Sequence, residues 1–314
     1  RLALGPRHDD SGAAAGYRRH LMAEGRLWVA LDAGRVVAFA GTRDIGGGRM
    51  LSDLFVHPDR QGSGIGGRLL DVVMTGAPAG FTFASDDPRA LPLYVRAGMS
   101  PVWPLLDVRG EVADLVAARP ASSRTRSAAC VVGPRQAAAV EAVLTGADRS
   151  VEHRYWAGRP GAVAMVAGAG STVAGGPSLV GGEVRNGDVA RTEHLGVRND
   201  RIPLGGAVME RDISGVEQWA AASDPSWVGV AVRTGDAARV EHLAVADDTD
   251  PCEAFDALLA ALGVSRYEAH VPGPSPLLRH LLDRLGRIVD LDHHMAGHPG
   301  LVPAQLHVVH PGLC

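Results

Sequence analysis

The sequence predicts an α+β protein of two related domains, each with a mixed, mostly antiparallel central sheet flanked by helices. Three observations support this fold class. The chain has 314 residues, which is long for one compact domain and comfortable for two. Each half contains strands that read as a hairpin. Each half also ends on the same order of strand, loop, helix, strand, helix and strand.

The first half alternates between helical and strand patterns. Apolar residues recur at helical spacing over residues 11–24. Two apolar strands, 27–31 and 35–41, then flank Asp32-Ala33-Gly34, which is a hairpin turn signal. The later elements that we expect are a strand at 50–56, a helix at 64–75, a strand at 81–84, a helix at 89–97 and a strand at 100–108.

Composition divides the chain into domains. We expect residues 1–110 to form the first domain, because residues 111–134 are rich in Ala, Pro, Ser and Arg and are typical of a linker. Residues 135–314 are then the second domain. Within it, 178–197 matches 226–245 at 13 of 20 positions, and each copy reads as two strands around a Gly-Asp turn. The second domain is therefore predicted to contain a duplicated hairpin.

The rest of the second domain repeats the ending of the first. Ahead of the duplicated hairpin we expect a helix at 135–144 and a strand at 163–166. After it we expect a helix at 252–262, a strand at 267–271, a helix at 276–285 and a strand at 288–292.

Bulk composition argues against several classes of partner. The net charge is −4 and no basic block is dense enough for nucleic acid, so we expect no nucleic-acid partner. No apolar run approaches the ~18 residues of a membrane helix, so we expect no membrane partner. The three cysteines lie far apart and no secretion signal is visible, which favours a cytoplasmic protein.

Residues 56–67, Val-His-Pro-Asp-Arg-Gln-Gly-Ser-Gly-Ile-Gly-Gly, carry the most chemical information. A strand ends there, the backbone turns through glycines, and an amphipathic helix begins at once. Glycines let the backbone approach a ligand closely, and the N–H groups at a helix start hold phosphate oxygens. The segment predicts a diphosphate site; the alternative is a tight turn that binds nothing.

One interpretation of this loop is a dinucleotide site. Gly62-x-Gly64-x-x-Gly67 matches the dinucleotide-binding fingerprint, and Asp86 and Asp87 follow about 20 residues later. The context disfavours it, because such a loop follows the first strand of a parallel sheet, and here at least three strands precede it.

The other interpretation is a family resemblance. Gln61-x-x-Gly64-x-Gly66 resembles the Q/R-x-x-G-x-G/A loop of GNAT acetyltransferases, which holds the pyrophosphate of coenzyme A. Residues 85–99 are similar to the family's N-x-x-A-x-x-x-Y-x-x-x-G-F segment. The resemblance covers roughly residues 11–108. The whole chain resembles tandem GNAT proteins that have an active N-terminal and a degenerate C-terminal domain.

The resemblance implies an acetyl-CoA site and no metal. The pantetheine arm would pair with the backbone of Leu54, Phe55 and Val56. Tyr94 stands where many GNAT enzymes protonate the departing thiolate, and Asp87 replaces the usual asparagine that contacts the cofactor. The pyrophosphate loop would comprise Gln61, Gly62, Ser63, Gly64, Ile65, Gly66 and Gly67.

The expected reaction is acetyl transfer from acetyl-CoA to a primary amine of a small molecule or peptide, by direct attack in a ternary complex. The amine must lose a proton, and Asp53 and Asp86 are both candidate bases, whereas His57 is expected to be exposed. A non-catalytic acyl-CoA-binding or regulatory module is the alternative. Both a monomer and a homodimer are compatible with the sequence.

The second domain lacks both motifs. If 239–245 corresponds to 50–56, the following loop, 246–251, holds three aspartates and no glycine, so it would repel a diphosphate. Leu282 stands where Tyr94 would be. We therefore expect no coenzyme A site there. We interpret the histidines of this half as surface residues: His194, His242, His293, His294, His298, His307 and His310.

Overall fold

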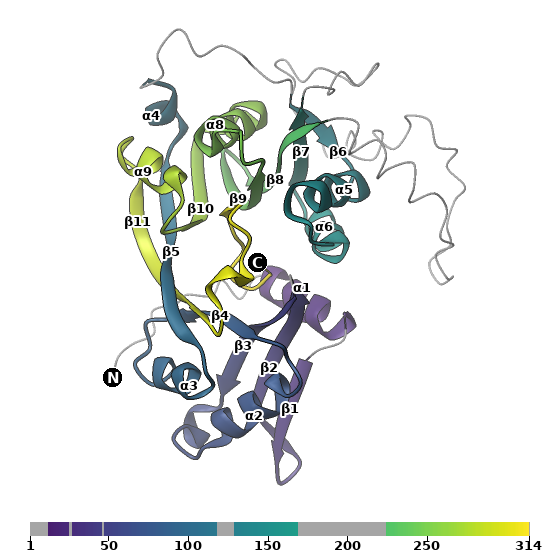
Figure 1. The fold of residues 1–314 in the computed structure, drawn as a ribbon, viewed down its shortest axis with the longest axis vertical. Coiled ribbons are helices and arrows are strands. Elements are labelled where there is room, and N and C mark those ends of the chain that lie inside the picture. The colour runs from purple at the N-terminus through teal and green to yellow at the C-terminus, as the bar shows by residue number, and fades with distance from the viewer. Residues whose placement is uncertain (1–11, 25–26, 46, 118–128, 169–223, 314) are drawn as a thin grey trace, which may run out of the picture. The chain divides into compact units, whose positions relative to one another are not determined.

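A computed structural model describes residues 12–24, 27–45, 47–117, 129–168 and 224–313, which group into two compact units (Figure 1). The first unit comprises residues up to Leu105 together with Leu291–Pro303 and the segment from His310 onward. The second comprises Leu106–Asp290 and Ala304–Val309. The sequence pattern assigns everything after residue 134 to the second domain, whereas contacts place two late segments in the first unit.

The sheet of the first unit has the strand order β1-β2-β3-β4-β11-β5. Only part of β5 and of β11 belongs to this unit, because each of these strands also contributes residues to the second unit. The elements are α1 (Gly12–Ala23), β1 (Leu27–Asp32), β2 (Arg35–Ile45), β3 (Gly48–Val56), η1 (Pro58–Arg60), α2 (Ile65–Met74), β4 (Gly80–Ser85), α3 (Leu91–Arg96), β5 (Ser100–Glu111), β11 (Arg287–Ala296) and η3 (Pro299–Leu301).

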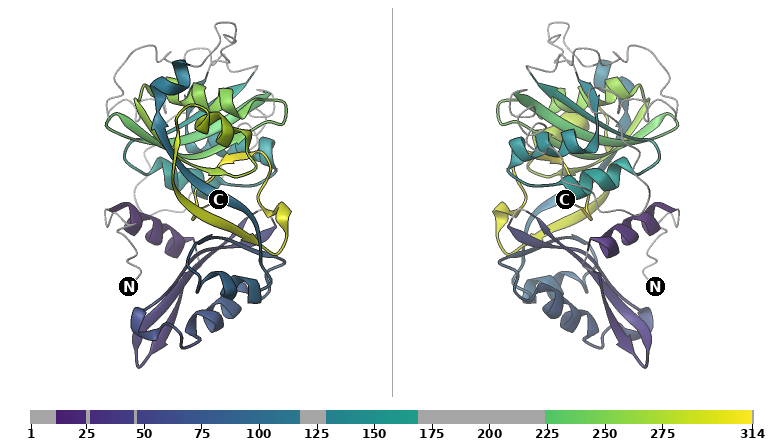
Figure 2. Two further views of the ribbon diagram at one scale, coloured as in Figure 1. Left: turned by 90° about the vertical axis from the view of Figure 1, so that its left-hand side faces the viewer. Right: turned by 90° about the vertical axis from the view of Figure 1, so that its right-hand side faces the viewer.

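The two faces of this sheet are covered by different helices. Ala38 and Ala40 of β2 pack against Leu69, Leu70 and Val73, the apolar stripe of α2. Helix α1 lies on the opposite face (Figure 2). We call these the α2 face and the α1 face. The β1–β2 hairpin closes through a two-residue turn in which both residues have positive φ, as the Ala-Gly pair at the predicted turn allows.

The sheet of the second unit has the order β5-β10-β9-β8-β7-β6, with β12 paired to β9. In both units a parallel pair, β3–β4 or β9–β10, follows an antiparallel hairpin. The elements are α4 (Val112–Ala117), β6 (Cys130–Val132), α5 (Pro134–Thr145), α6 (Ser150–Ala157), β7 (Ala162–Gly168), β8 (Pro225–Thr234), β9 (Ala237–Val245), α8 (Pro251–Leu262), β10 (Arg266–Pro272), α9 (Pro276–Leu282) and β12 (Leu306–Val308).

The predicted α+β class and the mostly antiparallel sheets are confirmed. The second copy of the repeated segment forms the β8–β9 hairpin around Gly235-Asp236. The first copy, 178–197, lies outside the described residues. Helix α6 was not expected from the sequence, because its buried face includes Glu152 and His153 and so shows no apolar stripe.

Candidate active site

A β-bulge in β3 sets the geometry of the site. Gly41 pairs with Asp53, but the next residue of β2, Thr42, pairs with Leu51, so Ser52 is the extra residue. The bulge turns two successive side chains to one face. A Cβ placed on Gly41 would lie 3.0 Å from Ser52 Oγ and 3.4 Å from Asp53 Oδ2. Glycine at position 41 therefore leaves room for both polar groups.

Strand β3 separates from β4 beyond the bulge. The parallel register joins residues 49–51 to residues 80–82 and ends there. At this point the Thr82 hydroxyl donates a hydrogen bond of 2.7 Å to the carbonyl of Leu51. Farther along, β4 is paired on its other side with β11, and β3 only with β2. The edge of β3 that faces β4 is thus open over residues 52–56, and its peptide groups are available to an extended ligand.

The loop that follows β3 is held by side chains rather than by its glycine N–H groups. Gln61 donates to the Val56 carbonyl at 3.2 Å and accepts from Arg89 at 2.7 Å. Ser63 Oγ donates to the Arg60 carbonyl at 2.5 Å. Gly62 has a positive φ of 77°, a conformation that other residues adopt only with strain.

Helix α2 presents its first N–H groups at the end of this loop. Gly64 caps the helix in the left-handed conformation, with φ 79°. The first intrahelical bond runs from the Arg68 N–H to the Gly64 carbonyl at 3.1 Å, so the N–H groups of residues 65–67 precede it. These groups, together with the helix dipole, favour an anion. A Cβ on Gly66 would lie 3.3 Å from Val56 Cγ2, so the loop and helix pack closely.

Tyr94 and Asp53 lie close enough to influence each other. Tyr94, on α3, is only 7% exposed and belongs to the core beneath α2. Burial, followed by the charges of Asp53 and Asp87, raises the pKa of Tyr94 to about 12. The phenol therefore stays protonated at neutral pH and can act only as a proton donor.

Asp53 is less exposed than a surface carboxylate, and its Oδ2 atom is buried. Burial raises the pKa of Asp53 to about 6, although a hydrogen bond with Tyr17 and the positive charge of Arg18 lower it. The Tyr17 hydroxyl also donates to the Gly312 carbonyl at 3.0 Å. A carboxyl with a pKa near neutrality can accept a proton at physiological pH.

A family comparison agrees with this geometry. Residues 23–98 match the family model of the acetyltransferase (GNAT) domain. This segment is a GNAT domain. It spans the hairpin, the open strand edge, the glycine loop, α2 and α3. Among curated proteins, nothing matches the chain.

Solved structures share the fold at low sequence identity. A candidate acetyltransferase from Pyrococcus horikoshii has a TM-score of 0.56 at 12% identity, covering 95% of this chain and 82% of that one. A conserved protein of unknown function from Enterococcus faecalis has 0.54 at 11%, covering 92% and 66%. A GCN5-related N-acetyltransferase from Anabaena variabilis has 0.52 at 12%, covering 91% and 66%. The chain spans just under two thirds of the latter two proteins.

Asp87 of the GNAT domain is committed to a neighbour. Its carboxylate accepts from the Arg89 backbone N–H at 2.9 Å and pairs with the Arg89 guanidinium at 2.6 Å. These interactions lower the pKa of Asp87. Since Arg89 also holds Gln61, the Asp87–Arg89 pair links the two GNAT-like motifs. Asp86 and His57 are exposed.

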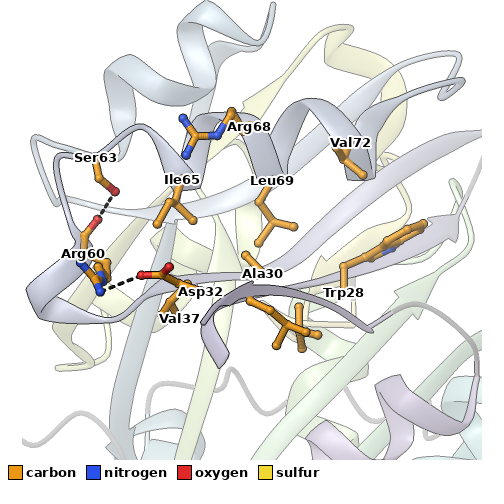
Figure 3. A pocket seen from close by; sticks show the side chains of 12 residues that line it. Trp28, Ala30, Asp32, Val37, Arg60, Ser63, Ile65, Arg68, Leu69 and Val72 are labelled. Atoms are coloured by element: carbon orange, nitrogen blue, oxygen red, sulfur yellow. Dashed lines mark hydrogen bonds and ion pairs between the residues drawn. The ribbon is translucent and has the colours of Figure 1, made fainter. Parts of the chain in front are cut away.

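A groove of about 600 Å³ lies between β1 and α2 of the GNAT domain (Figure 3). Its floor is apolar and includes Leu69, while the exposed ring of Trp28 lies at one end. At the other end Arg60 pairs with Asp32 at 2.7 Å, close to Ser63. The groove therefore borders the start of α2 on the side away from β4.

Aromatic residues surround His294 on the α1 face of the GNAT domain. His294 lies opposite Phe83 in the β11–β4 register, and its ring centroid is 4.1 Å from that of Trp103. The side chain is completely buried, and burial lowers the pKa of His294 to about 4. The interpretation of His294 and His242 as surface residues is wrong, because both are buried in apolar surroundings; His293 and His307 are partly buried, and His298 is exposed.

The second unit repeats the bulge with other residues. Val230 pairs with His242 and Ala231 with Val240, so Glu241 is the extra residue. The His242 ring lies 2.9 Å from the Glu141 carboxylate, which also contacts His153 at 2.6 Å. Burial opposes ionisation of Glu141, but His242, Arg149 and His153 hold its pKa well below the usual value.

The loop after β9 is built differently from the glycine loop. Asp250 caps α8 by accepting a hydrogen bond from the Cys252 N–H at 2.9 Å, so a carboxylate fills the helix start. Leu282 ends α9 and is 38% exposed. In the part of the chain that the structure describes, no group of three or more His, Cys, Asp or Glu side chains could hold a metal ion. Nor is any described helix long and apolar enough to span a membrane.

Several residues of the site were not identified from the sequence. Gly41 and Ser52 matter because of the bulge, which leaves no pattern in a single strand. Thr82 and Tyr17 act through contacts with distant residues. Only Arg89 carried a local signal, since an Asp-x-Arg segment at the start of a helix favours this pairing.

Proposed function

We propose that the GNAT domain binds acetyl-CoA and transfers its acetyl group to a primary amine of a small molecule or peptide. One observation supports this most strongly: the open edge of β3 leads directly into the N–H groups at the start of α2. An extended arm can pair with the former while a diphosphate occupies the latter. The chain thereby offers adjacent sites for the two parts of one cofactor.

The cofactor would contact the chain mainly through backbone groups. The pantetheine arm would pair with Leu54, Phe55 and Val56, and the pyrophosphate would accept hydrogen bonds from the N–H groups of residues 62–67. Gln61 would support the loop rather than contact the phosphates, because its amide already bonds to Val56 and Arg89. Asp87, held by Arg89, would stabilise the same loop.

The reaction would be a direct transfer in a ternary complex. The amine loses a proton to Asp53, directly or through water, and its nitrogen attacks the thioester carbonyl carbon. The tetrahedral intermediate collapses, the carbon–sulfur bond breaks, and the departing thiolate takes the proton of Tyr94. The products are the amide and coenzyme A. Asp53 has a pKa suited to the base, and Tyr94 remains protonated at neutral pH.

A non-catalytic acyl-CoA-binding module is the second candidate. The near-complete burial of Tyr94 favours it, because a packing tyrosine would have the same environment. The two candidates share the cofactor site and differ in turnover. Acetylation of any primary amine, dependent on Tyr94, would exclude the module.

Calorimetry with coenzyme A tests the cofactor site. We expect Gly64→Leu/Gly66→Leu to weaken binding at least about tenfold, because side chains there would fill the space beside the N–H groups. Gly76→Leu is the matched control: φ is 74° at Gly76 and 79° at Gly64, and Gly76 lies at the other end of α2. Equal affinity of the double variant and the wild type would refute the site.

A further inference from the structure

The α1 face of the first unit's hairpin carries an exposed apolar row. Val29 lies directly opposite Phe39, and Phe39 lies opposite Phe55. Residues in register share a face. Val29 is 50% and Phe55 is 49% exposed, and the rings of Phe39 and Phe55 stack with centroids 5.2 Å apart. We call these three residues the apolar shelf.

The shelf adjoins the candidate base. The next row on the same face joins Leu27, Gly41 and Asp53. Residues two apart on a strand are separated by about 7 Å on one face. The Asp53 carboxylate therefore lies about 7 Å from the start of the shelf, and the missing side chain of Gly41 leaves the path between them open.

Apolar groups also border Asp53 on its other side. Ala84 and Met295 belong to the core on the α2 face, so their neighbours Phe83 and His294 lie on the α1 face. His294 is buried among aromatic rings, which keep it uncharged. The one cation that acts on Asp53 is Arg18 of α1, among the residues that the structure describes. Asp53 is thus a carboxylate between two aromatic surfaces.

We propose that the acceptor is a primary amine carried on an apolar body of aromatic size, with its nitrogen at Asp53 and its body on the apolar shelf. This inference rests on the proposed function and specifies its acceptor. A strand face that stays half-exposed next to a reactive group gains most by covering itself with an apolar ligand. A hydrophilic amine would leave the shelf in water and gain nothing from it.

Two primary amines on two-carbon stems test the proposal: 2-phenylethylamine and ethanolamine. We expect kcat/KM with acetyl-CoA to be about thirtyfold higher for 2-phenylethylamine, the effect of burying one aromatic ring. Phe39→Ser should reduce this preference to about threefold while leaving ethanolamine turnover unchanged. Phe39 has no role in cofactor binding, so the loss would report on the acceptor alone.

A milder pair of variants guards against misfolding. Val29→Ser and Val143→Ser make the same substitution at residues that are 50% and 47% exposed, the first on the shelf and the second on α5. We expect only Val29→Ser to lower the preference for 2-phenylethylamine, by about threefold. Sedimentation of each variant shows whether the shelf instead joins two copies of the chain.

Several results would overturn the proposal. These are equal kcat/KM for the two amines, an equal loss for both amines in Phe39→Ser, and no difference between Val29→Ser and Val143→Ser. A dimer that Val29→Ser dissociates without changing amine preference would assign the shelf to self-association. Failure of coenzyme A to bind would refute the proposed function itself, whereas binding without preference for the apolar amine would refute only this inference.

Discussion

His242 occupies in β9 the register position that Asp53 occupies in β3. In both strands the residue just before it is the extra residue of a bulge, Ser52 in one and Glu241 in the other. The duplicated fold has therefore kept the backbone irregularity and exchanged its chemistry. Asp53 retains a buried oxygen that no other group satisfies, whereas His242 is enclosed with Glu141 and His153.

Replacing Asp53 tests its role as base. We expect Asp53→Asn to lower kcat/KM by about 10²- to 10³-fold, because the amide cannot accept the proton. In the wild type, kcat/KM should fall as the pH drops through about 6, where Asp53 becomes protonated. A pH–rate profile of both proteins checks this, and the inflection near 6 should vanish in the variant. Asp86→Asn is the control, and a loss as large there would contradict the assignment.

Tyr94→Phe separates catalysis from packing. The variant keeps the ring in the core and removes only the proton donor, so we expect kcat to fall about 10²-fold. Coenzyme A affinity by calorimetry and the thermal midpoint should stay unchanged. Unaltered kcat would show that the hydroxyl plays no part in the chemistry.

The ionic cluster of the second unit should be critical for stability. Glu141→Gln leaves His242, His153 and Arg149 without their buried counter-charge, so we expect the free energy of unfolding to fall by about 3–5 kcal/mol. Denaturant titration measures it. Asp71→Asn, on the exposed side of α2, should change stability by no more than about 0.5 kcal/mol.

His294 should make the protein acid-sensitive. Its folded pKa of about 4 lies below the unfolded value near 6.5, so the unfolded state binds this proton first as the pH falls. Stability should drop between about pH 6.5 and 4, by up to about 3 kcal/mol from this residue. Comparing unfolding of the wild type and His294→Phe at pH 7 and pH 4 isolates the contribution. A parallel loss in both proteins would contradict the prediction.

Local signals predicted much of the GNAT domain. The glycines of the loop, the apolar stripe of α2 and the turn at Ala33-Gly34 each depend on residues close together in sequence. The open edge of β3 was implied by the family resemblance, and the register gives it a physical cause, because pairing with β4 ends at Thr82.

Features that depend on distant residues could not be predicted. The bulge at Ser52 is a property of two strands, so β3 alone reads as a regular strand. His294 was interpreted as a surface residue because its aromatic neighbours come from β4 and β5, about 200 residues earlier. For the same reason the sequence assigned 291–303 to the second domain.

The pairing of β4 with β11 also determines when the first unit can fold. Residues 292–296 supply the neighbour of β4, and they leave the ribosome about 200 residues after β4 itself. At ~5–20 residues per second, the peptide groups of Phe81–Ser85 wait some 10 to 40 seconds for their partner. Completion of the acetyltransferase sheet is therefore a late event in synthesis, and truncation after residue 110 would leave β4 as an unprotected edge.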